Sequence, residues 1–227
     1  MIISLAQTKG GVGKTTIAVN ITIDLWQRGY DVLLVDADDQ QTASDFTALR
    51  ESEVENCGYT LVELSGANVR NQVIKLAKKH DHVVVDVGGR DTAALRAALT
   101  VSDIALLPFQ PRSFDIWTFE KMSGLIEEAR PFNDLLDAYA ILNFCDPSGS
   151  DNQDARQALE GNSQIEFLDA RLGRRKALAN AAAAGRGVNE VRSKDSKACG
   201  EMSYLVEKLL KLQKDRENGY RTQAITA

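Results

Sequence analysis

The chain has 227 residues, of which 44% are hydrophobic and 26% are charged, and its formal net charge at pH 7 is −5. This apolar content is sufficient to bury a core, and one α/β domain is expected at this length. No stretch reaches the roughly 18 apolar residues that a membrane span requires, and no basic segment precedes the first apolar run, which argues against a signal peptide. We expect a single domain over residues 1–214 and a flexible polar tail over residues 215–227.

The most informative motif, KGGVGKTT over residues 9–16, lies close to the start of the chain. It follows an apolar, β-prone run over residues 2–6 and begins a helical pattern over residues 15–28, which Gly29 ends. Strand, glycine-rich loop and helix are the context that a phosphate loop needs. The motif fits the pattern G-x-x-x-x-G-K-S/T when the first glycine position is relaxed to the preceding threonine or lysine.

Each residue type in this loop suits a bound nucleotide. The glycines let backbone N–H groups point at phosphate oxygens, and the start of the following helix adds partial positive charge. Lys14 is expected to reach the β- and γ-phosphates, while Thr15 binds Mg²⁺ directly and Thr16 donates to the α-phosphate. One lysine is enough for the terminal phosphates, so we interpret Lys9 as directed at a nucleotide held by another subunit. The predicted nucleotide-binding residues of the loop are Gly10, Gly11, Val12, Gly13, Lys14, Thr15 and Thr16.

Strand and helix patterns alternate along the chain. Continuous apolar runs, which suit parallel strands covered on both faces, occupy residues 32–35, 83–85, 104–107 and 139–142. Helical patterns occupy residues 69–79, 92–99, 114–129, 153–159, 174–184 and 194–214. The alternation predicts an α/β fold, a doubly wound, mostly parallel sheet with helices on both faces. Ligands of such sheets bind at the carboxyl ends of the strands, where the sequence places Asp36, Asp86, Pro108 and Asn143.

Two of these strand ends carry carboxylates. Asp86 ends a valine-rich run and precedes a Gly-Gly pair, an arrangement that suits an aspartate holding Mg²⁺ through water. Asp36 and Asp38 share one face of an extended strand, so that one can serve the metal while the other faces the attacking water. The alternatives are an ordinary strand-end cap for Asp86 and solvated loop acids for the other two.

Three segments together, residues 9–16, 35–40 and 84–89, resemble the deviant Walker-A ATPases of the ParA/MinD group, which are P-loop NTPases. The resemblance extends from Met1 to about Leu210, so it covers nearly the whole chain. The short length is most similar to the small ParA partition ATPases of plasmids. What the resemblance implies is an ATPase that hydrolyses ATP to ADP and phosphate with Mg²⁺ as cofactor.

The resemblance also implies a role for each candidate residue. Lys9 resembles the lysine that crosses a dimer to the partner's nucleotide, Lys14 the phosphate-loop lysine, and Asp38 the aspartate that activates water. The residues implied near Mg²⁺ are Thr15, directly, and Asp36 and Asp86, through water.

Two more positions follow the family's pattern and one departs from it. Asn143 resembles the asparagine that contacts adenine, and residues 109–111 resemble the segment that responds to nucleotide. Asp39 stands where the family usually has proline. An extra carboxylate there can repel phosphate or point to solvent, which affects the tuning of hydrolysis rather than ATP binding.

The charge of the chain is unevenly distributed. Residues 170–198 hold eight basic and two acidic residues, a net charge of +6 in a chain whose total is −5, and such asymmetry indicates a partner. In the resembling family this region binds DNA without sequence preference, through phosphate contacts that depend strongly on salt. The alternative is a set of solvated helix faces. The predicted DNA-binding residues are Arg171, Arg174, Arg175, Lys176, Arg186, Arg192, Lys194 and Lys197.

The resemblance implies a cytoplasmic, nucleoid-associated partition ATPase. Its ATP-bound homodimer would bind nonspecific DNA, and a ParB-like centromere-binding partner would stimulate hydrolysis, so that cargo such as plasmid DNA is segregated. A positioning ATPase for a protein assembly is an alternative within the same family.

Two further alternatives belong to other classes. A MinD-like membrane-surface regulator of cell division would use the terminal helix, but we favour docking of that helix on the sheet and expect no membrane partner. A metabolic ATP-dependent enzyme on the same scaffold would be a dethiobiotin-synthetase-like ligase or a nitrogenase-reductase-like protein. The latter would need cluster-ligating cysteines at strand ends; Cys145 is close to one, but Cys57 and Cys199 fall in loop or helix contexts.

Overall fold

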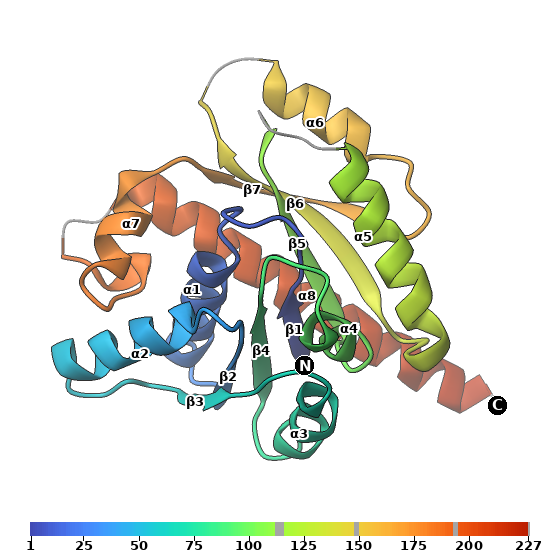
Figure 1. The fold of residues 1–227 in the computed structure, drawn as a ribbon, viewed down its shortest axis with the longest axis horizontal. Coiled ribbons are helices and arrows are strands. Elements are labelled where there is room, and N and C mark those ends of the chain that lie inside the picture. The colour runs from blue at the N-terminus through green and yellow to red at the C-terminus, as the bar shows by residue number, and fades with distance from the viewer. Residues whose placement is uncertain (112–115, 148–149, 193–194, 227) are drawn as a thin grey trace.

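The computed structural model describes the backbone of residues 1–111, 116–147, 150–192 and 195–226. Within these residues the strands form one sheet in the order β3-β2-β4-β1-β5-β6-β7, and every neighbouring pair is parallel (Figure 1). From β1 the chain passes to β2 and the edge strand β3, returns to β4 beside β1, and then continues through β5, β6 and β7 on the other side. Such a doubly wound sheet has its crevice at the carboxyl ends of the central strands. The strands are β1 (Ile2–Leu5), β2 (Val32–Ala37), β3 (Thr60–Glu63), β4 (His82–Val87), β5 (Ile104–Phe109), β6 (Asp137–Cys145) and β7 (Glu166–Gly173).

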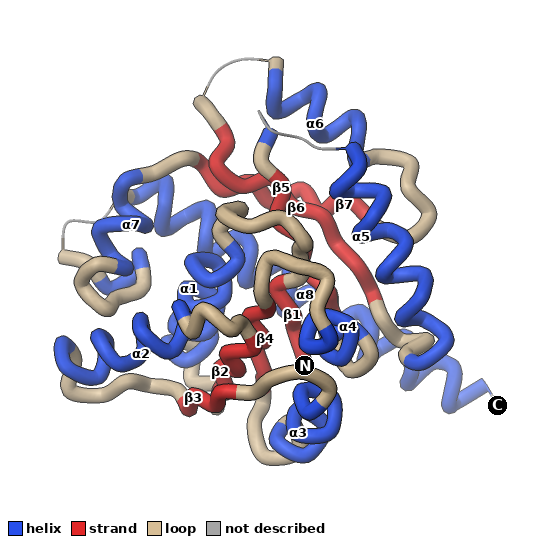
Figure 2. Tube along the Cα trace, in the orientation of Figure 1, coloured by secondary structure: helices blue, strands red, loops and turns tan. Residues whose placement is uncertain are grey.

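Helices cover both faces of this sheet, and Figure 2 shows the strands enclosed between them. One face packs against α1, α2, α7 and α8, and the other packs against α3, α4, α5 and α6. The predicted α/β architecture is therefore confirmed. The helices are α1 (Lys14–Gln27), α2 (Thr42–Glu53), α3 (Asn68–Leu76), α4 (Ala93–Leu99), α5 (Ile116–Ala129), α6 (Asp151–Leu159), α7 (Lys176–Ala182) and α8 (Ser196–Thr226).

The central strands are buried on both faces, as their continuous apolar runs predicted. In β2, Val32 and Leu34 pack toward α1, whereas Leu33 and Val35 pack toward the opposite helix layer, and all four are fully buried. Alternate side chains of a strand point to opposite faces, so a strand in the middle of two helix layers has no polar side.

Three elements were missed by the sequence patterns: α2, β3 and β7. The two strands lie at the edges of the sheet, and fewer of their residues are buried than in the central strands. In β7, buried Leu168 and Ala170 alternate with exposed Asp169 and Arg171, so no continuous apolar run marks the strand. The helix α2 is mostly polar and buries few residues. Prediction from apolar runs finds the centre of this sheet and overlooks its margins.

The terminal helix α8 docks on the sheet, as expected. Leu205, Val206 and Leu209 are at most 1% exposed and belong to the core on that face. The helix continues past residue 214, where the sequence pattern predicted its end, and Arg216 donates a hydrogen bond to the Asp103 carbonyl at 2.8 Å. No helix in the described part of the chain is long and apolar enough to cross a membrane.

Candidate nucleotide-binding site

A cavity of about 870 Å³ opens at the carboxyl ends of the central strands. It is walled by the phosphate loop after β1, by the segment after β2 that carries Asp38, and by the segment after β4 that carries Gly88 and Gly89. Phe144, near the end of β6, completes the wall. This volume lies within the range of small-ligand pockets, about 300–1,000 Å³.

Glycine is required at two places beside the cavity: within the phosphate loop and in the Gly-Gly pair after β4. Gly11 and Gly13 have φ angles of 72° and 90°, in the left-handed region that side chains disfavour. A Cβ on Gly13 would also lie 2.3 Å from the amide nitrogen of Asn143, and one on Gly89 would lie 2.8 Å from the Gly10 Cα. The Gly-Gly pair after β4 thus lets its loop approach the phosphate loop closely. A side chain at Gly89 would displace the backbone at Gly10, and one at Gly13 would displace the Asn143 side chain.

Lys14 begins α1 and is held at the base of the cavity. Its side chain is 7% exposed, and its Nζ donates to the Lys9 carbonyl at 3.3 Å. Burial lowers the pKa of Lys14, while the nearby carboxylates of Asp86 and Asp38 raise it. A buried cation near acids at a helix N-terminus is well placed to bind phosphate. Val12 is buried behind the loop, while Thr15 and Thr16 line the cavity.

Asp86 is a buried carboxylate without a hydrogen-bond partner. It is 0% exposed, and within the described residues neither of its oxygens accepts a hydrogen bond. Burial raises the pKa of Asp86 to about 7, against the influence of the Thr15 hydroxyl and of Lys14. An unsatisfied buried acid beside a threonine and a phosphate loop is the donor set that Mg²⁺ with its waters would satisfy. The residues present therefore fit a magnesium ion.

Replacing Asp86 with asparagine is expected to stabilise the nucleotide-free, Mg²⁺-free protein at pH 8, raising the midpoint of thermal unfolding by about 3 °C or more. The folded-state pKa is raised from 3.8 to about 7. The stability that Asp86 contributes is therefore complete below pH 3.8 and is lost as the pH rises through about 7. The difference between variant and wild type should grow from pH 5 to pH 8 in thermal melts. Asp39→Asn, an exposed acid of the same cavity, is the control, and a destabilised Asp86→Asn would contradict the expectation.

Asp36 and Asp38 have different surroundings. One oxygen of Asp36 accepts hydrogen bonds from the backbone N–H and hydroxyl of Ser44, both at 2.8 Å, and the other accepts from the Asp38 N–H at 3.1 Å. Asp36 thus anchors the start of α2, an arrangement that sequence reasoning missed because α2 itself was missed. Asp38 lines the cavity, and a Cβ on Gly88 would lie 3.1 Å from its Oδ1. Of the two, only Asp38 is among the described residues that line the cavity, and its role toward an attacking water remains a prediction.

Lys9 and Gln110 lie beside the phosphate loop. Lys9 is half-buried, and its carbonyl accepts the bond from Lys14. Gln110 donates through its side chain to the Gly11 carbonyl at 2.8 Å, which connects the segment after β5 to the loop. Gln110 therefore contacts the phosphate loop, whereas the response of residues 109–111 to nucleotide remains a prediction.

Asn143 packs against the phosphate loop and is not among the residues that line the cavity. It is 3% exposed, and its Nδ2 donates to the Val12 carbonyl at 2.8 Å. Its contact with adenine remains a prediction. The neighbouring Phe144, by contrast, lines the cavity. Sequence reasoning missed this residue because a phenylalanine in an apolar strand usually belongs to the core.

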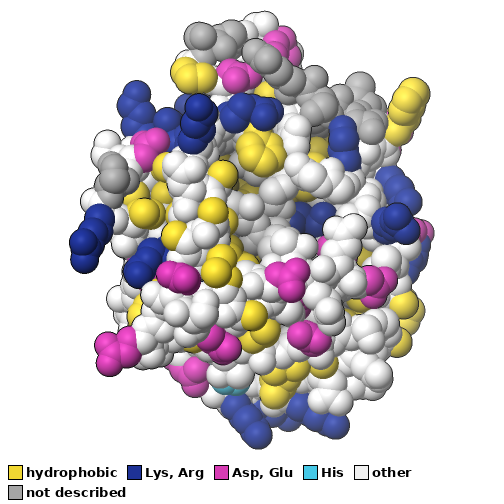
Figure 3. Space-filling view, turned by 60° about the vertical axis from the view of Figure 1, so that its left-hand side comes forward, with side chains coloured by type: hydrophobic (Ala, Val, Ile, Leu, Met, Phe, Trp, Pro, Cys, Tyr) yellow, Lys and Arg dark blue, Asp and Glu magenta, His cyan; other side chains and the backbone are white. Residues whose placement is uncertain are grey.

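The predicted DNA-binding residues differ in their contacts. Arg175 is paired with Glu201 through two hydrogen bonds, and Arg186 donates to the Glu53 carbonyl at 3.3 Å. Figure 3 shows several Lys and Arg side chains in the upper half of the face around the hollow. Lys194 lies outside the described residues. The predicted residues that are exposed are Arg171, Arg174, Lys176, Arg192 and Lys197.

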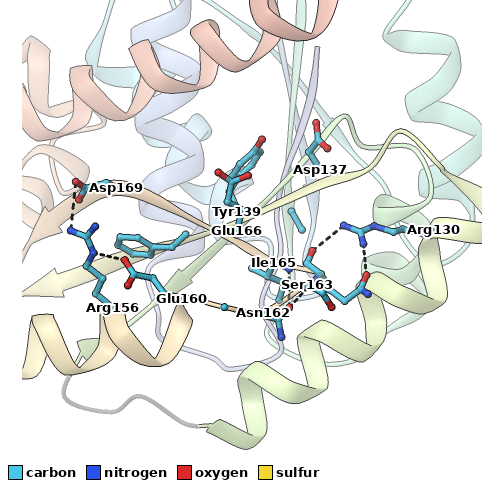
Figure 4. Close-up of a pocket in the computed structure, with 14 residues that line it drawn as sticks. Arg130, Asp137, Tyr139, Arg156, Glu160, Asn162, Ser163, Ile165, Glu166 and Asp169 are labelled. Carbon is cyan, nitrogen blue, oxygen red and sulfur yellow. Dashed lines mark hydrogen bonds and ion pairs between the residues drawn. The ribbon is translucent and has the colours of Figure 1, made fainter. Parts of the chain in front are cut away.

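A separate cavity of about 460 Å³ lies at the opposite end of β6, where that strand begins (Figure 4). Its charged side chains engage one another: Arg156 contacts Glu160 and Asp169, and Arg130 donates to the Gln164 carbonyl at 3.0 Å. No residue of the phosphate loop reaches this cavity. The chemistry of the predicted site is thus confined to the carboxyl ends of the strands.

A parallel, doubly wound sheet with a phosphate loop after its central strand defines a P-loop NTPase fold. Residues 3–188 match a family model described as the CobQ/CobB/MinD/ParA nucleotide binding domain, and the chain belongs to this family. The resemblance to the ParA/MinD group is therefore confirmed.

Three known proteins illustrate the similarity. Maintenance of carboxysome distribution protein A of Halothiobacillus neapolitanus is 30% identical over 210 residues, which cover 92% of this chain and 95% of that protein. A plasmid partition protein from Borrelia burgdorferi has a similar structure, with a TM-score of 0.65 and 18% identity, over 92% of this chain and 97% of that one. Cobyrinic acid a,c-diamide synthase from Mycobacterium smegmatis, solved with bound ADP and magnesium, has a TM-score of 0.67 and 21% identity, over 82% and 90% of the two chains.

Proposed function

We propose that this chain is an ATP-hydrolysing switch that positions or segregates cargo over DNA. The observation that carries the ATPase part is Asp86, an unsatisfied buried carboxylate beside Thr15 and Lys14 at the phosphate loop. Such a set suits a magnesium-bound nucleotide, and a protein of similar fold, cobyrinic acid a,c-diamide synthase, was solved with ADP and magnesium. When bound, Mg²⁺ neutralises charge on the phosphates.

The chain's own residues divide the work of hydrolysis. The loop N–H groups and Lys14 hold the phosphates, and Asp38 orients the attacking water at the γ-phosphate, since phosphoryl transfer depends mainly on positioning and charge neutralisation. Thr15 would hold the metal directly, and Asp86 would hold it through water. Asp36 acts through Ser44 by fixing the start of α2, so its part at the metal is indirect.

Lys9 is proposed to act between two subunits. Lys9 is the first residue of the loop motif, and Lys14 already occupies the base of the cavity. In an ATP-bound homodimer, Lys9 of each subunit would neutralise phosphate held by the other. Dimer formation then depends on ATP, and hydrolysis separates the subunits.

The dimer is proposed to bind nonspecific DNA through the exposed basic residues of residues 170–198. Each lysine or arginine that contacts a phosphate releases a counterion and steepens the dependence of affinity on salt. The exposed residues Arg171, Arg174 and Lys176 suit such contacts, whereas Glu201 already neutralises Arg175.

Lys176→Ala is therefore expected to weaken ATP-dependent DNA binding and to lower the slope of log affinity against log salt by about 1. Arg175→Ala, at the adjacent position, should change this slope much less because its charge is paired with Glu201. Fluorescence anisotropy with an unrelated duplex across a salt series measures both. Equal slopes for all three proteins would count against this surface as the DNA-binding face.

Two kinds of cargo are compatible with this switch. Plasmid DNA, with a ParB-like centromere-binding partner, follows from the resemblance to small ParA proteins. A protein assembly is favoured by the 30% identity with the carboxysome distribution protein. Stimulation of hydrolysis separates them: a plasmid system needs the partner together with its centromere DNA, whereas an assembly system responds to an adaptor of the assembly without such DNA.

A further inference from the structure

Strand β6 ends in an irregularity that borders the nucleotide cavity. Its pairing with β7 shifts register between Leu142 and Cys145. Within this stretch Phe144 has a φ of 58°, in the left-handed region that an aromatic residue rarely adopts. Bulges re-aim side chains beside binding sites, and such a backbone persists only where the surroundings enforce it. The end of β6 is therefore shaped for something other than sheet pairing.

The bulge turns two successive side chains toward the same loop. In a regular strand, neighbouring side chains point to opposite faces. Here the Asn143 amide donates to the Val12 carbonyl at 2.8 Å, and a Cβ on Gly13 would lie 3.4 Å from the Cζ of Phe144. Asn143 thereby braces the phosphate loop, while Phe144 is presented to the cavity.

Phe144 lies where the nucleoside would leave the phosphate loop. In a phosphate loop, Lys14 would contact the β- and γ-phosphates and Thr15 the metal. The α-phosphate would then lie near Thr16, and the sugar and base would lie beyond it. Phe144 lines the cavity next to this exit, and it is the one aromatic side chain among the described residues of that lining. An aromatic ring there offers a flat apolar surface of the kind on which bases stack.

Arg174 supports the ring from outside the cavity. Its guanidinium carbon lies 5.2 Å from the centroid of the Phe144 ring, within the distance at which a cation is attracted to an aromatic face. Arg174 lines a different cavity, of about 520 Å³, to which Phe144 does not contribute. The ring is thus held between the nucleotide cavity and an arginine of the basic segment.

We propose that Phe144 is the base-stacking residue of the nucleotide site, with the β6 bulge and Arg174 holding its ring in place. The inference rests on the proposed function, because it takes the cavity to bind ATP. Phe144 then contributes to affinity for the nucleoside and not for the phosphates. Stacking is tolerant of base identity, so its contribution should be similar for ATP and GTP.

The test compares binding of Mg·ATP and Mg·tripolyphosphate, a probe without sugar or base, to the full chain by isothermal titration calorimetry. Phe144→Ala should weaken ATP binding about tenfold, as loss of one stacked base predicts, and should leave tripolyphosphate binding within about twofold of wild type. Phe144→Trp should keep ATP affinity, because its ring still stacks. Arg174→Ala should weaken ATP binding by a smaller factor, and Lys75→Ala, an exposed lysine on α3, should have no effect.

Each contrary outcome has a distinct meaning. Equal weakening of both probes by Phe144→Ala would show that the ring only supports the phosphate loop, and unchanged ATP affinity would show that it does not touch the base; either result overturns the inference and leaves the ATPase intact. Failure of the unmodified chain to bind ATP overturns both the inference and the proposed function. Loss of ATP affinity in Phe144→Trp, with tripolyphosphate binding retained, also contradicts stacking as the mode of contact.

Discussion

Replacing Lys14 with alanine is expected to reduce ATP hydrolysis at least about 100-fold, the size of effect seen when one group that stabilises transition-state charge is removed. The side chain is buried at the base of the cavity, between Asp86 and the phosphate loop. Without it, the phosphates would face the carboxylates of Asp86 and Asp38 with less positive charge beside them. Release of phosphate in a coupled assay measures the rate, and calorimetry measures the loss of ATP binding.

The two lysines of the loop should be separable by experiment. Lys9→Ala is expected to retain ATP binding but to lose ATP-dependent dimer formation in light scattering, since Lys9 is proposed to act on the partner's nucleotide. Lys75→Ala, an exposed lysine at the end of α3, is the control and should alter neither property. Dimers formed normally by Lys9→Ala with ATP would refute the role of Lys9, and normal hydrolysis by Lys14→Ala would refute the site itself.

Replacing Arg50 with alanine is expected to lower the free energy of unfolding by about 3–5 kcal/mol, because it leaves Glu190, whose side chain is only 11% exposed, without its partner. Arg50 is 0% exposed and forms two hydrogen bonds with Glu190, at 2.6 and 2.8 Å. It also donates to the carbonyls of Cys57 and Gly185. Although burial alone would raise the pKa of Glu190, the bond from Arg50 holds that pKa below its usual value. The pair joins α2 to the loop before α8.

Urea unfolding of matched variants checks this expectation. Arg70→Ala removes an exposed arginine whose side chain donates to the Thr100 carbonyl, and it should cost less than about 1 kcal/mol. Replacing both Arg50 and Glu190 by apolar residues of similar size should recover much of the loss, because no buried charge is then left alone. A loss below about 1 kcal/mol in Arg50→Ala would contradict the account of this pair.

Local patterns were sufficient to predict the centre of the fold and the phosphate loop. The apolar runs of β2 and β4 report burial on both faces, and KGGVGKTT combines a backbone shape with the charges that phosphate needs. Both signals are contained within a few consecutive residues. The placement of Asp86 followed from one rule, that carboxyl ends of parallel strands meet at one edge.

The rest depends on contacts between distant parts of the chain. Glu190 is one of the two acids counted in the basic segment, and its partner, Arg50, lies 140 positions earlier in the chain. Arg175 counted as free charge, although Glu201 on α8 neutralises it. Phe144 gave no signal because a bulge, and not its residue type, turns it to the cavity. None of these pairings has a periodicity that a sequence pattern can reveal.

The central claim, an ATP-controlled DNA-binding switch, is tested most directly by DNA binding with ATP, with ADP and without nucleotide, on unrelated duplexes across a salt series. The account predicts binding with ATP only, equal for all sequences and falling steeply with salt. Equal binding in all three nucleotide states, or no binding in any of them, would contradict it. The second result would leave the basic residues as an ordinary solvated surface.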